Sequence, residues 1–153
     1  MVQWLAVTPE DTEKFGERLA ASRPGGQALA VIYLQGDLGA GKTTFARGFL
    51  RGCGATGAVR SPTYSLMEVH ELADVSVIHL DLYRLRDPSE LEVLGLRDWA
   101  RPGHVWLIEW PDRGAGWLPL SDLSVELRGG PAGHEINVRG TSALGNQWMG
   151  QLK

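Results

Sequence analysis

The chain contains a single cysteine and no long hydrophobic run. Because Cys53 is the only cysteine, an intramolecular disulfide is excluded, as is the cysteine spacing of a zinc site. The longest apolar stretch, residues 28–34, is far shorter than the roughly 18 residues that a membrane-spanning helix needs. Residues 1–14 lack the basic segment and apolar core of a signal peptide. We therefore expect a soluble, cytoplasmic protein that depends on its hydrophobic core for stability.

The sequence also lacks a strong excess of charge of either sign. It has 15 Lys and Arg residues against 18 Asp and Glu residues, which gives a net charge of −3. This mild acidity argues against bulk electrostatic binding to nucleic acid. A length of 153 residues, 43% of them hydrophobic, is ordinary for one globular domain, and we expect a single P-loop domain over 1–153.

Hydrophobic periodicity predicts that helices and strands alternate along the chain. Helical spacing of apolar residues favours helices over 9–22, 43–53, 87–100 and 143–149. Short β-rich runs favour strands over 28–34, 64–70, 75–83, 104–110, 123–128 and 135–139. The second and third strands read as one hairpin, and the last two as another. This pattern predicts an α/β fold of the P-loop NTPase type, a three-layer sandwich around a mostly parallel sheet with antiparallel additions.

The helix over 87–100 has a recognisable start. Asp87 can cap it, Pro88 suits the first helical position, and Glu90 can reach back to the amide of the cap.

The most specific motif is a phosphate-binding loop between the strand at 28–34 and the helix at 43–53. The full pattern G-x-x-x-x-G-K-[ST] is matched by Gly36, Asp37, Leu38, Gly39, Ala40, Gly41, Lys42 and Thr43, and Thr44 follows. The glycines let backbone amides approach phosphate oxygens, and the start of the helix adds its own unpaired amides. Lys42 supplies charge to the β- and γ-phosphates, and the Thr43 hydroxyl suits Mg²⁺. We expect binding of ATP with Mg²⁺.

Two carboxylates are candidates for work beside this loop. Asp81 and Glu109 each end an apolar strand, where an unpaired charge is costly to place. With a phosphate loop present, at least one of them should be functional, and the pattern does not say which. Arg84 suits either the γ-phosphate or a structural ion pair, and its position favours the ion pair. The four histidines, His79 among them, read as core or surface residues. The hydroxyl-rich segment 61–64 either reaches the γ-phosphate or metal or is an ordinary loop.

Five segments together resemble one family. GDLGAGKTT (36–44), SPTYSL (61–66), HLDLYRL (79–85), ELEVLGLRDW (90–99) and IEWPDR (108–113) occur in this order. The chain thereby resembles the bacterial TsaE family, also called YjeE, over roughly residues 4–128. The family is the P-loop ATPase of tRNA threonylcarbamoyladenosine (t6A) biosynthesis.

The resemblance implies a partner-dependent ATPase. Family members bind and hydrolyse ATP to ADP while associating with the TsaB–TsaD pair, which transfers threonylcarbamoyl to an adenosine of certain tRNAs. Hydrolysis would reset that complex between turnovers, and an indirect association with tRNA is a further expectation. The sequence leaves open whether tRNA is contacted directly. By position, Thr43 and Glu109 would hold Mg²⁺, and Asp81 would orient the attacking water.

The resemblance also implies further site residues. Thr12 would lie near the nucleotide base. The family positions tied to activity or partner contact are matched here by Thr63, Tyr64, Tyr83, Arg84 and Trp110. The resemblance therefore favours Arg84 as a catalytic residue, beside Lys42 and Asp81.

Three other functions are alternatives to this one. A small-molecule or nucleotide kinase shares the loop and fold, and Arg84, Arg86, Arg97 and Arg101 could serve an arginine-bearing lid. A GTP switch would need an N-K-x-D motif, which the sequence lacks. A non-enzymatic module would bind ATP tightly without hydrolysis, even with its partners present.

Overall fold

A mixed β-sheet carries the whole architecture. The computed structural model describes residues 1–25, 29–37, 39–59, 62, 65–130 and 133–152. The strands are β1 (Val2–Ala6), β2 (Ala30–Gln35), β3 (Met67–Glu71), β4 (Ser76–Asp81), β5 (His104–Glu109), β6 (Leu123–Gly130) and β7 (Gly133–Gly140). The helices are α1 (Pro9–Ala21), α2 (Lys42–Gly52), α3 (Glu90–Val93) and α4 (Ala143–Gln151), with short 3₁₀ helices η1 (Leu96–Trp99) and η2 (Pro111–Gly114). No helix in these described ranges is long and apolar enough to cross a membrane.

The strand order of the sheet is β1-β7-β6-β2-β5-β4-β3. The four central strands β6, β2, β5 and β4 run parallel. Strand β3 pairs antiparallel with β4, β7 with β6, and β1 with β7, so that β1 again runs in the direction of the central strands. Both predicted hairpins are present, as β3–β4 and β6–β7. The predicted α/β fold with a mostly parallel centre is therefore confirmed.

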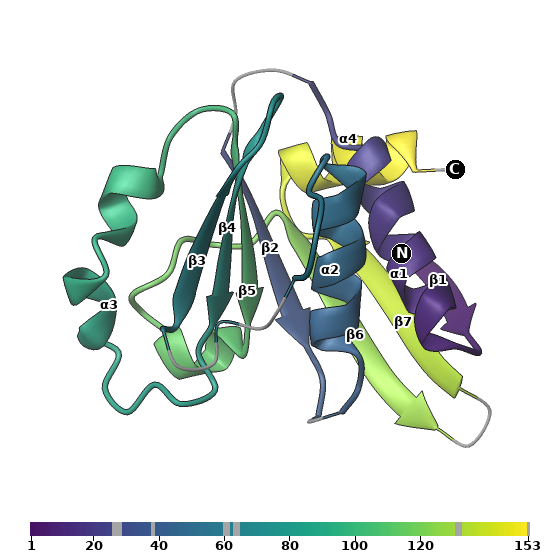
Figure 1. Ribbon diagram of the computed structural model, residues 1–153, viewed down its shortest axis with the longest axis horizontal. Helices are drawn as coiled ribbons and strands as arrows, with labels where there is room; N and C mark the ends of the chain where they lie inside the picture. Colours follow the sequence, from purple (N-terminus) through teal and green to yellow (C-terminus); the bar gives the residue numbers. More distant parts are fainter. Residues whose placement is uncertain (26–28, 38, 60–61, 63–64, 131–132, 153) are drawn as a thin grey trace.

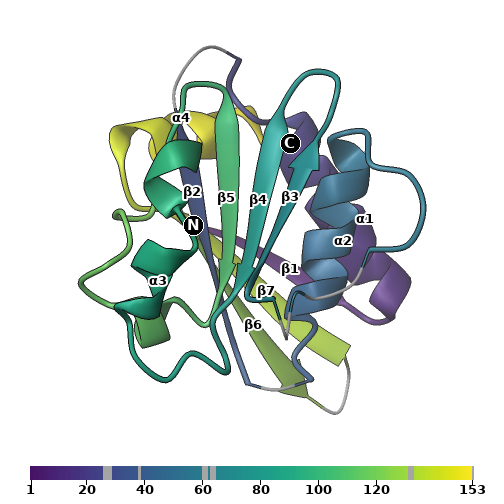
Figure 2. The ribbon, with the colours of Figure 1, turned by 60° about the vertical axis from the view of Figure 1, so that its left-hand side comes forward.

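Helices cover both faces of the sheet, which gives three layers. Figure 1 shows α1, α2 and α4 on one face and α3 on the other, and Figure 2 shows β2, β5, β4 and β3 side by side between them. Side chains alternate along β5, so that Val105 and Leu107 join the core beneath α1 and α2, whereas Trp106 and Ile108 join the core beneath α3. The same alternation turns Glu109 toward α2.

Helices α1 and α2 pack unusually closely because glycines lie at their contact. A Cβ atom added to Gly48 would lie 2.6 Å from Glu13 Cα, and one added to Gly16 would lie 2.5 Å from the Phe45 carbonyl oxygen. These positions exclude a larger side chain unless the helices separate. The close contact fixes α2, and with it the phosphate loop that precedes α2.

The predicted single helix over 87–100 is wrong. Gly95 adopts a left-handed φ of 68° and separates α3 from η1. Leu91 and Leu96 are both buried, yet on one continuous helix residues five apart would point to nearly opposite sides. The break at Gly95 lets both leucines face the sheet.

The predicted cap of this segment is also wrong. Ser89 is the N-cap residue, and the Asp87 carboxylate accepts a hydrogen bond from the Ser89 amide. Glu90 accepts from the amide of Arg86, one residue before the expected cap.

Strand β1 was not predicted. It is short, and it forms by pairing antiparallel with β7, with Trp4 opposite Ile136. Helix α1 follows it through a capping box, in which Thr8 accepts from the Asp11 amide and Asp11 accepts from the Thr8 amide.

Candidate functional site

The glycine-rich loop lies between β2 and α2, where the carboxyl ends of the parallel strands meet (Figure 1). Gly36 and Gly41 have φ angles of 150° and 100°. A Cβ on Gly36 would collide with the Leu127 carbonyl, and one on Gly41 would lie 2.9 Å from His134 Nδ1. The loop therefore requires glycine at both positions, for its backbone conformation and for the approach of β6 and β7.

The start of α2 keeps its backbone amides available. Its N-cap residue, Gly41, offers no side-chain hydrogen bond, and no acidic residue lies in the first turn. The first amides of a helix have no partner within the helix and attract anions. This end of α2 is thus suited to bind phosphate.

Lys42 is buried and faces back into its own loop. Its ammonium donates hydrogen bonds to the carbonyl oxygens of Gly36 and, at 2.9 Å, of Asp37. Burial lowers the pKa of the Lys42 ammonium, while the nearby Glu109, Asp81 and Asp37 oppose this shift. The nearby carboxylates favour the charged form of Lys42, and a desolvated charged donor forms strong hydrogen bonds to phosphate oxygens.

Both candidate carboxylates reach this loop from neighbouring strands. Asp81 ends β4 and Glu109 ends β5, and the two residues are register partners in the sheet. They are 6% and 2% exposed, which is rare for acidic side chains that lack a specific role. Thr43 Oγ1 donates to Glu109 Oε1 at 3.3 Å, whereas Asp81 Oδ1 accepts from the Tyr83 amide at 3.1 Å.

The oxygen atoms of Thr43 and Glu109 fit a magnesium ion. Mg²⁺ prefers oxygen ligands, keeps several waters, and takes only one or two carboxylates together with phosphate oxygens. A hydroxyl and a buried carboxylate 3.3 Å apart meet this requirement. The described residues contain no cluster of three or more His, Cys, Asp or Glu side chains, the arrangement of an all-protein metal cage. Thr43 and Glu109 present oxygens of the kind that Mg²⁺ takes as ligands.

A cavity of about 420 Å³ brings most of the predicted residues together. Its walls are Gly39, Gly41, Lys42, Thr43, Thr44, Asp81, Tyr83, Arg84, Glu109 and Trp110. Gly36 and Asp37 line an adjoining cavity, also bordered by Trp110, and Ala40 is packed into the core.

Three predicted residues are not in this group. Thr12 is 1% exposed on the buried side of α1 and does not line either cavity. Leu38 and Thr63 lie outside the described residues, as do Ser61 and Tyr64.

An aromatic group forms one wall of the cavity. The rings of Tyr83 and Trp110 have centroids 5.0 Å apart, and the Arg113 guanidinium lies 5.1 Å from the Tyr83 ring centre. Trp110 has a left-handed φ of 58° and is followed by Pro111, which starts η2. This sharp turn after Glu109 directs the indole over Lys42. Arg113 was not identified from the sequence.

His79 is the main residue that sequence reasoning missed. It is fully buried on β4, and its Nε2 lies 2.6 Å from Glu109 Oε2. The sequence does indicate that His79 and Asp81 share one face of a strand, because His79 precedes Asp81 by two positions. A buried histidine alone does not reveal its partner on another strand.

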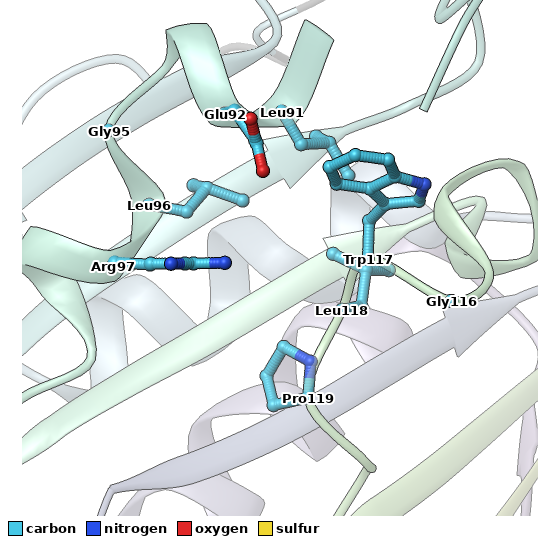
Figure 3. Close-up of a pocket in the computed structure, with 9 residues that line it drawn as sticks. All are labelled: Leu91, Glu92, Gly95, Leu96, Arg97, Gly116, Trp117, Leu118 and Pro119. Carbon is cyan, nitrogen blue, oxygen red and sulfur yellow. The ribbon is translucent and has the colours of Figure 1, made fainter. Parts of the chain in front are cut away.

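A separate cavity of about 540 Å³ lies on the opposite face of the sheet (Figure 3). Leu91 and Leu96 on one side face Trp117 and Pro119 on the other, with Arg97 at the edge. None of the predicted site residues lines it.

Comparisons with known proteins show which family the chain resembles. The family model "Threonylcarbamoyl adenosine biosynthesis protein TsaE" matches residues 6–136. A Haemophilus influenzae protein named tRNA threonylcarbamoyladenosine biosynthesis protein TsaE is 50% identical over 97 residues, which are 63% of this chain and 61% of that protein. The match thus spans less than two thirds of the Haemophilus protein.

A curated Bacillus subtilis protein and a crystal structure from the same species each match almost end to end. The one named tRNA threonylcarbamoyladenosine biosynthesis protein TsaE is 36% identical over 149 residues, 96% of this chain and 89% of that protein. The crystal structure of YdiB superimposes with a TM-score of 0.81 at 29% identity, covering 99% of this chain and 93% of that one. The resemblance inferred from the motifs and the predicted fold class are both confirmed.

Proposed function

Because the chain belongs to the TsaE family of threonylcarbamoyladenosine biosynthesis, we propose that it binds and hydrolyses ATP with Mg²⁺ in that pathway. We further propose that it does so together with the TsaB–TsaD pair. The observation that carries the proposal is the contact of Thr43 with Glu109 at the mouth of the phosphate loop. It joins the loop to a buried carboxylate on the neighbouring β5, as a Mg²⁺-dependent nucleotide site requires.

The chain's own residues supply binding and orientation. The amides at the start of α2 and the Lys42 ammonium hold the triphosphate, and Thr43 and Glu109 hold the ion. Mg²⁺, when bound, neutralises charge on the β- and γ-phosphates. Lys42 exchanges its contacts with the Gly36 and Asp37 carbonyls for phosphate oxygens, which become its new acceptors.

In this proposal Asp81 orients the attacking water. It lies beside Glu109 at the end of β4, and the Tyr83 amide holds one of its oxygens at 3.1 Å. A carboxylate fixed in this way accepts a hydrogen bond and then a proton from the water, so that the lone pair of the water oxygen is directed at the γ-phosphate. Catalysis then rests on positioning and charge stabilisation, as phosphoryl transfer generally does.

The partner proposal rests on the family and on the exposure of residues that line the site. Arg84 is exposed and lines the cavity with the half-buried Tyr83 and Trp110, so a partner protein can reach the site there. Hydrolysis by the isolated chain is therefore expected to be weak, and TsaB and TsaD are expected to raise it.

Tracing the γ-phosphate tests this proposal against a kinase function. ATP labelled at the γ-phosphate is incubated with the protein, Mg²⁺, TsaB and TsaD, and the fate of the label is followed. The proposal expects inorganic phosphate as the product. Label transferred to an added nucleotide or small-molecule acceptor would instead identify a kinase.

A further inference from the structure

His79 is buried in the sheet and lies against the proposed magnesium ligand. The residue is on β4, is 0% exposed, and comes two positions before Asp81. Its Nε2 lies 2.6 Å from Glu109 Oε2 on the adjacent strand β5. Of the interactions described for Glu109, this one is the shortest.

The contact joins a ring nitrogen that can donate or accept to a carboxylate that only accepts when it is ionised. A carboxylate must be ionised to hold a metal ion, and in that form of the site His79 Nε2 is the donor. The other ring nitrogen, Nδ1, is buried and has no hydrogen-bond partner among the described residues. The Nε2 contact is therefore the polar interaction that holds this imidazole in place.

The two oxygens of Glu109 have different partners. Oε2 accepts from His79, and Oε1 accepts from Thr43 at 3.3 Å. A carboxylate free to rotate would exchange these oxygens. The His79 contact fixes the plane of the carboxylate and keeps Oε1 directed at the hydroxyl of the phosphate loop.

We propose that His79 is a positioning residue that orients Glu109 for Mg²⁺, an inference that rests on the function proposed above. Carboxylates that bind metals are generally oriented by a second hydrogen bond, and loss of that partner costs about 10- to 100-fold in metal affinity or activity. His79 touches neither nucleotide nor ion in this account and acts only through Glu109. A purely structural histidine would instead contribute to folding without altering the metal dependence of the site.

Three substitutions separate these roles. His79→Leu removes the donor and keeps an apolar filling of similar size. His79→Gln keeps an N–H donor near the position of Nε2, whereas His79→Asn places its amide nearer the position of Nδ1. The Gln and Asn variants form a matched polar pair that keeps the test valid if the Leu variant fails to fold, which thermal unfolding of each protein shows.

The experiment measures ATP binding by calorimetry on the full chain, first in EDTA and then across a Mg²⁺ titration. We expect His79→Leu and His79→Asn to need about 10- to 100-fold more Mg²⁺ for the half-maximal effect. Their affinity for ATP in EDTA should equal that of the parent. His79→Gln should restore Mg²⁺ dependence close to that of the parent.

Two results overturn the inference. One is an unchanged Mg²⁺ requirement in folded His79→Leu or His79→Asn. The other is an equal loss of ATP affinity with and without Mg²⁺, which indicates general damage to the site. Failure of the proposed function is distinguishable, because the parent protein would then show no Mg²⁺-dependent binding of ATP before any variant is compared.

Discussion

The Nζ atom of Lys42 lies 4.2 Å from the centre of the Trp110 ring. The same ammonium donates to the Gly36 and Asp37 carbonyls, so the cation is held between its own loop and the indole. A cation over an aromatic face gains about 0.5–2 kcal/mol, the larger value when it is desolvated. Phosphate binding must therefore replace contacts that Lys42 already makes. The contribution of the Lys42 charge to nucleotide affinity is thus a direct test of the site.

Replacing Lys42 should strongly weaken nucleotide binding without unfolding the protein. Lys42→Ala deletes a charged donor to phosphate, which contributes about 1.5–3 kcal/mol, or roughly 10- to 100-fold in affinity. Lys14→Ala is the matched control, because Lys14 is exposed on α1, away from the cavity. Titration calorimetry with MgATP measures both variants. Binding by Lys42→Ala at the affinity of Lys14→Ala would contradict the role of Lys42.

The hydroxyl of Thr43 should matter for Mg²⁺ more than the bulk of the side chain. Thr43→Val keeps the shape and removes the oxygen that lies 3.3 Å from Glu109, whereas Thr43→Ser keeps the oxygen. We expect Thr43→Val to raise the Mg²⁺ concentration needed for ATP binding by at least about tenfold, and Thr43→Ser to resemble the parent. A Mg²⁺ titration of both proteins checks this. Equal behaviour of the two variants would mean that the hydroxyl is not a ligand.

The glycine contact between α1 and α2 should be necessary for stability. In Gly48→Ala the new Cβ would lie 2.6 Å from Glu13 Cα, so the helices must separate, at a cost of about 1–3 kcal/mol. Gly150→Ala is the control, since nothing lies within 4 Å of its Cβ and alanine favours α4 by about 0.5–1 kcal/mol. Urea denaturation measures both free energies of unfolding. The idea fails if Gly48→Ala is as stable as the parent.

The buried thiol of Cys53 should make stability fall at alkaline pH. Burial raises the pKa of this thiol from 9.0 to about 11, although the nearby Arg23 opposes the shift. Between these values the unfolded chain loses the thiol proton and the folded chain keeps it, so the free energy of unfolding decreases as pH rises. The loss contributed by this group is at most about 2–3 kcal/mol.

Comparison with Cys53→Ala isolates this effect. Urea denaturation at several pH values from about 8.5 upward covers the range of the pKa shift. Over this range the free energy of unfolding should fall less steeply with pH for the variant than for the parent. The variant itself should be somewhat less stable at all pH values, because it leaves a small cavity. Parallel declines in the two proteins would show that the thiol does not titrate differently on unfolding.

Local patterns were sufficient to predict the phosphate loop and the strands that end in Asp81 and Glu109. A strand, a glycine turn and an amphipathic helix follow one another directly, so neighbouring residues carry the signal. Helix α2 (Lys42–Gly52) lies within one residue of its predicted range at each end. The choice between the two carboxylates could not be made from the pattern, because it depends on which one faces Thr43 across the sheet.

The elements that were missed depend on contacts between distant residues. Strand β1 exists because Val2 pairs with Val138, and His79 gains its partner only when β4 and β5 lie side by side. The break at Gly95 likewise follows from burial of Leu91 and Leu96 against one sheet face. In each case tertiary packing decides the outcome, and local propensity does not report it.

The measurement that tests the account most directly is the rate of phosphate release from MgATP, with and without TsaB and TsaD, for the parent and for Asp81→Ala. We expect release to appear or rise when the partners are added. We expect Asp81→Ala to bind ATP with the parent's affinity and to show no turnover. Hydrolysis by Asp81→Ala at the parent's rate with the partners present would contradict the account.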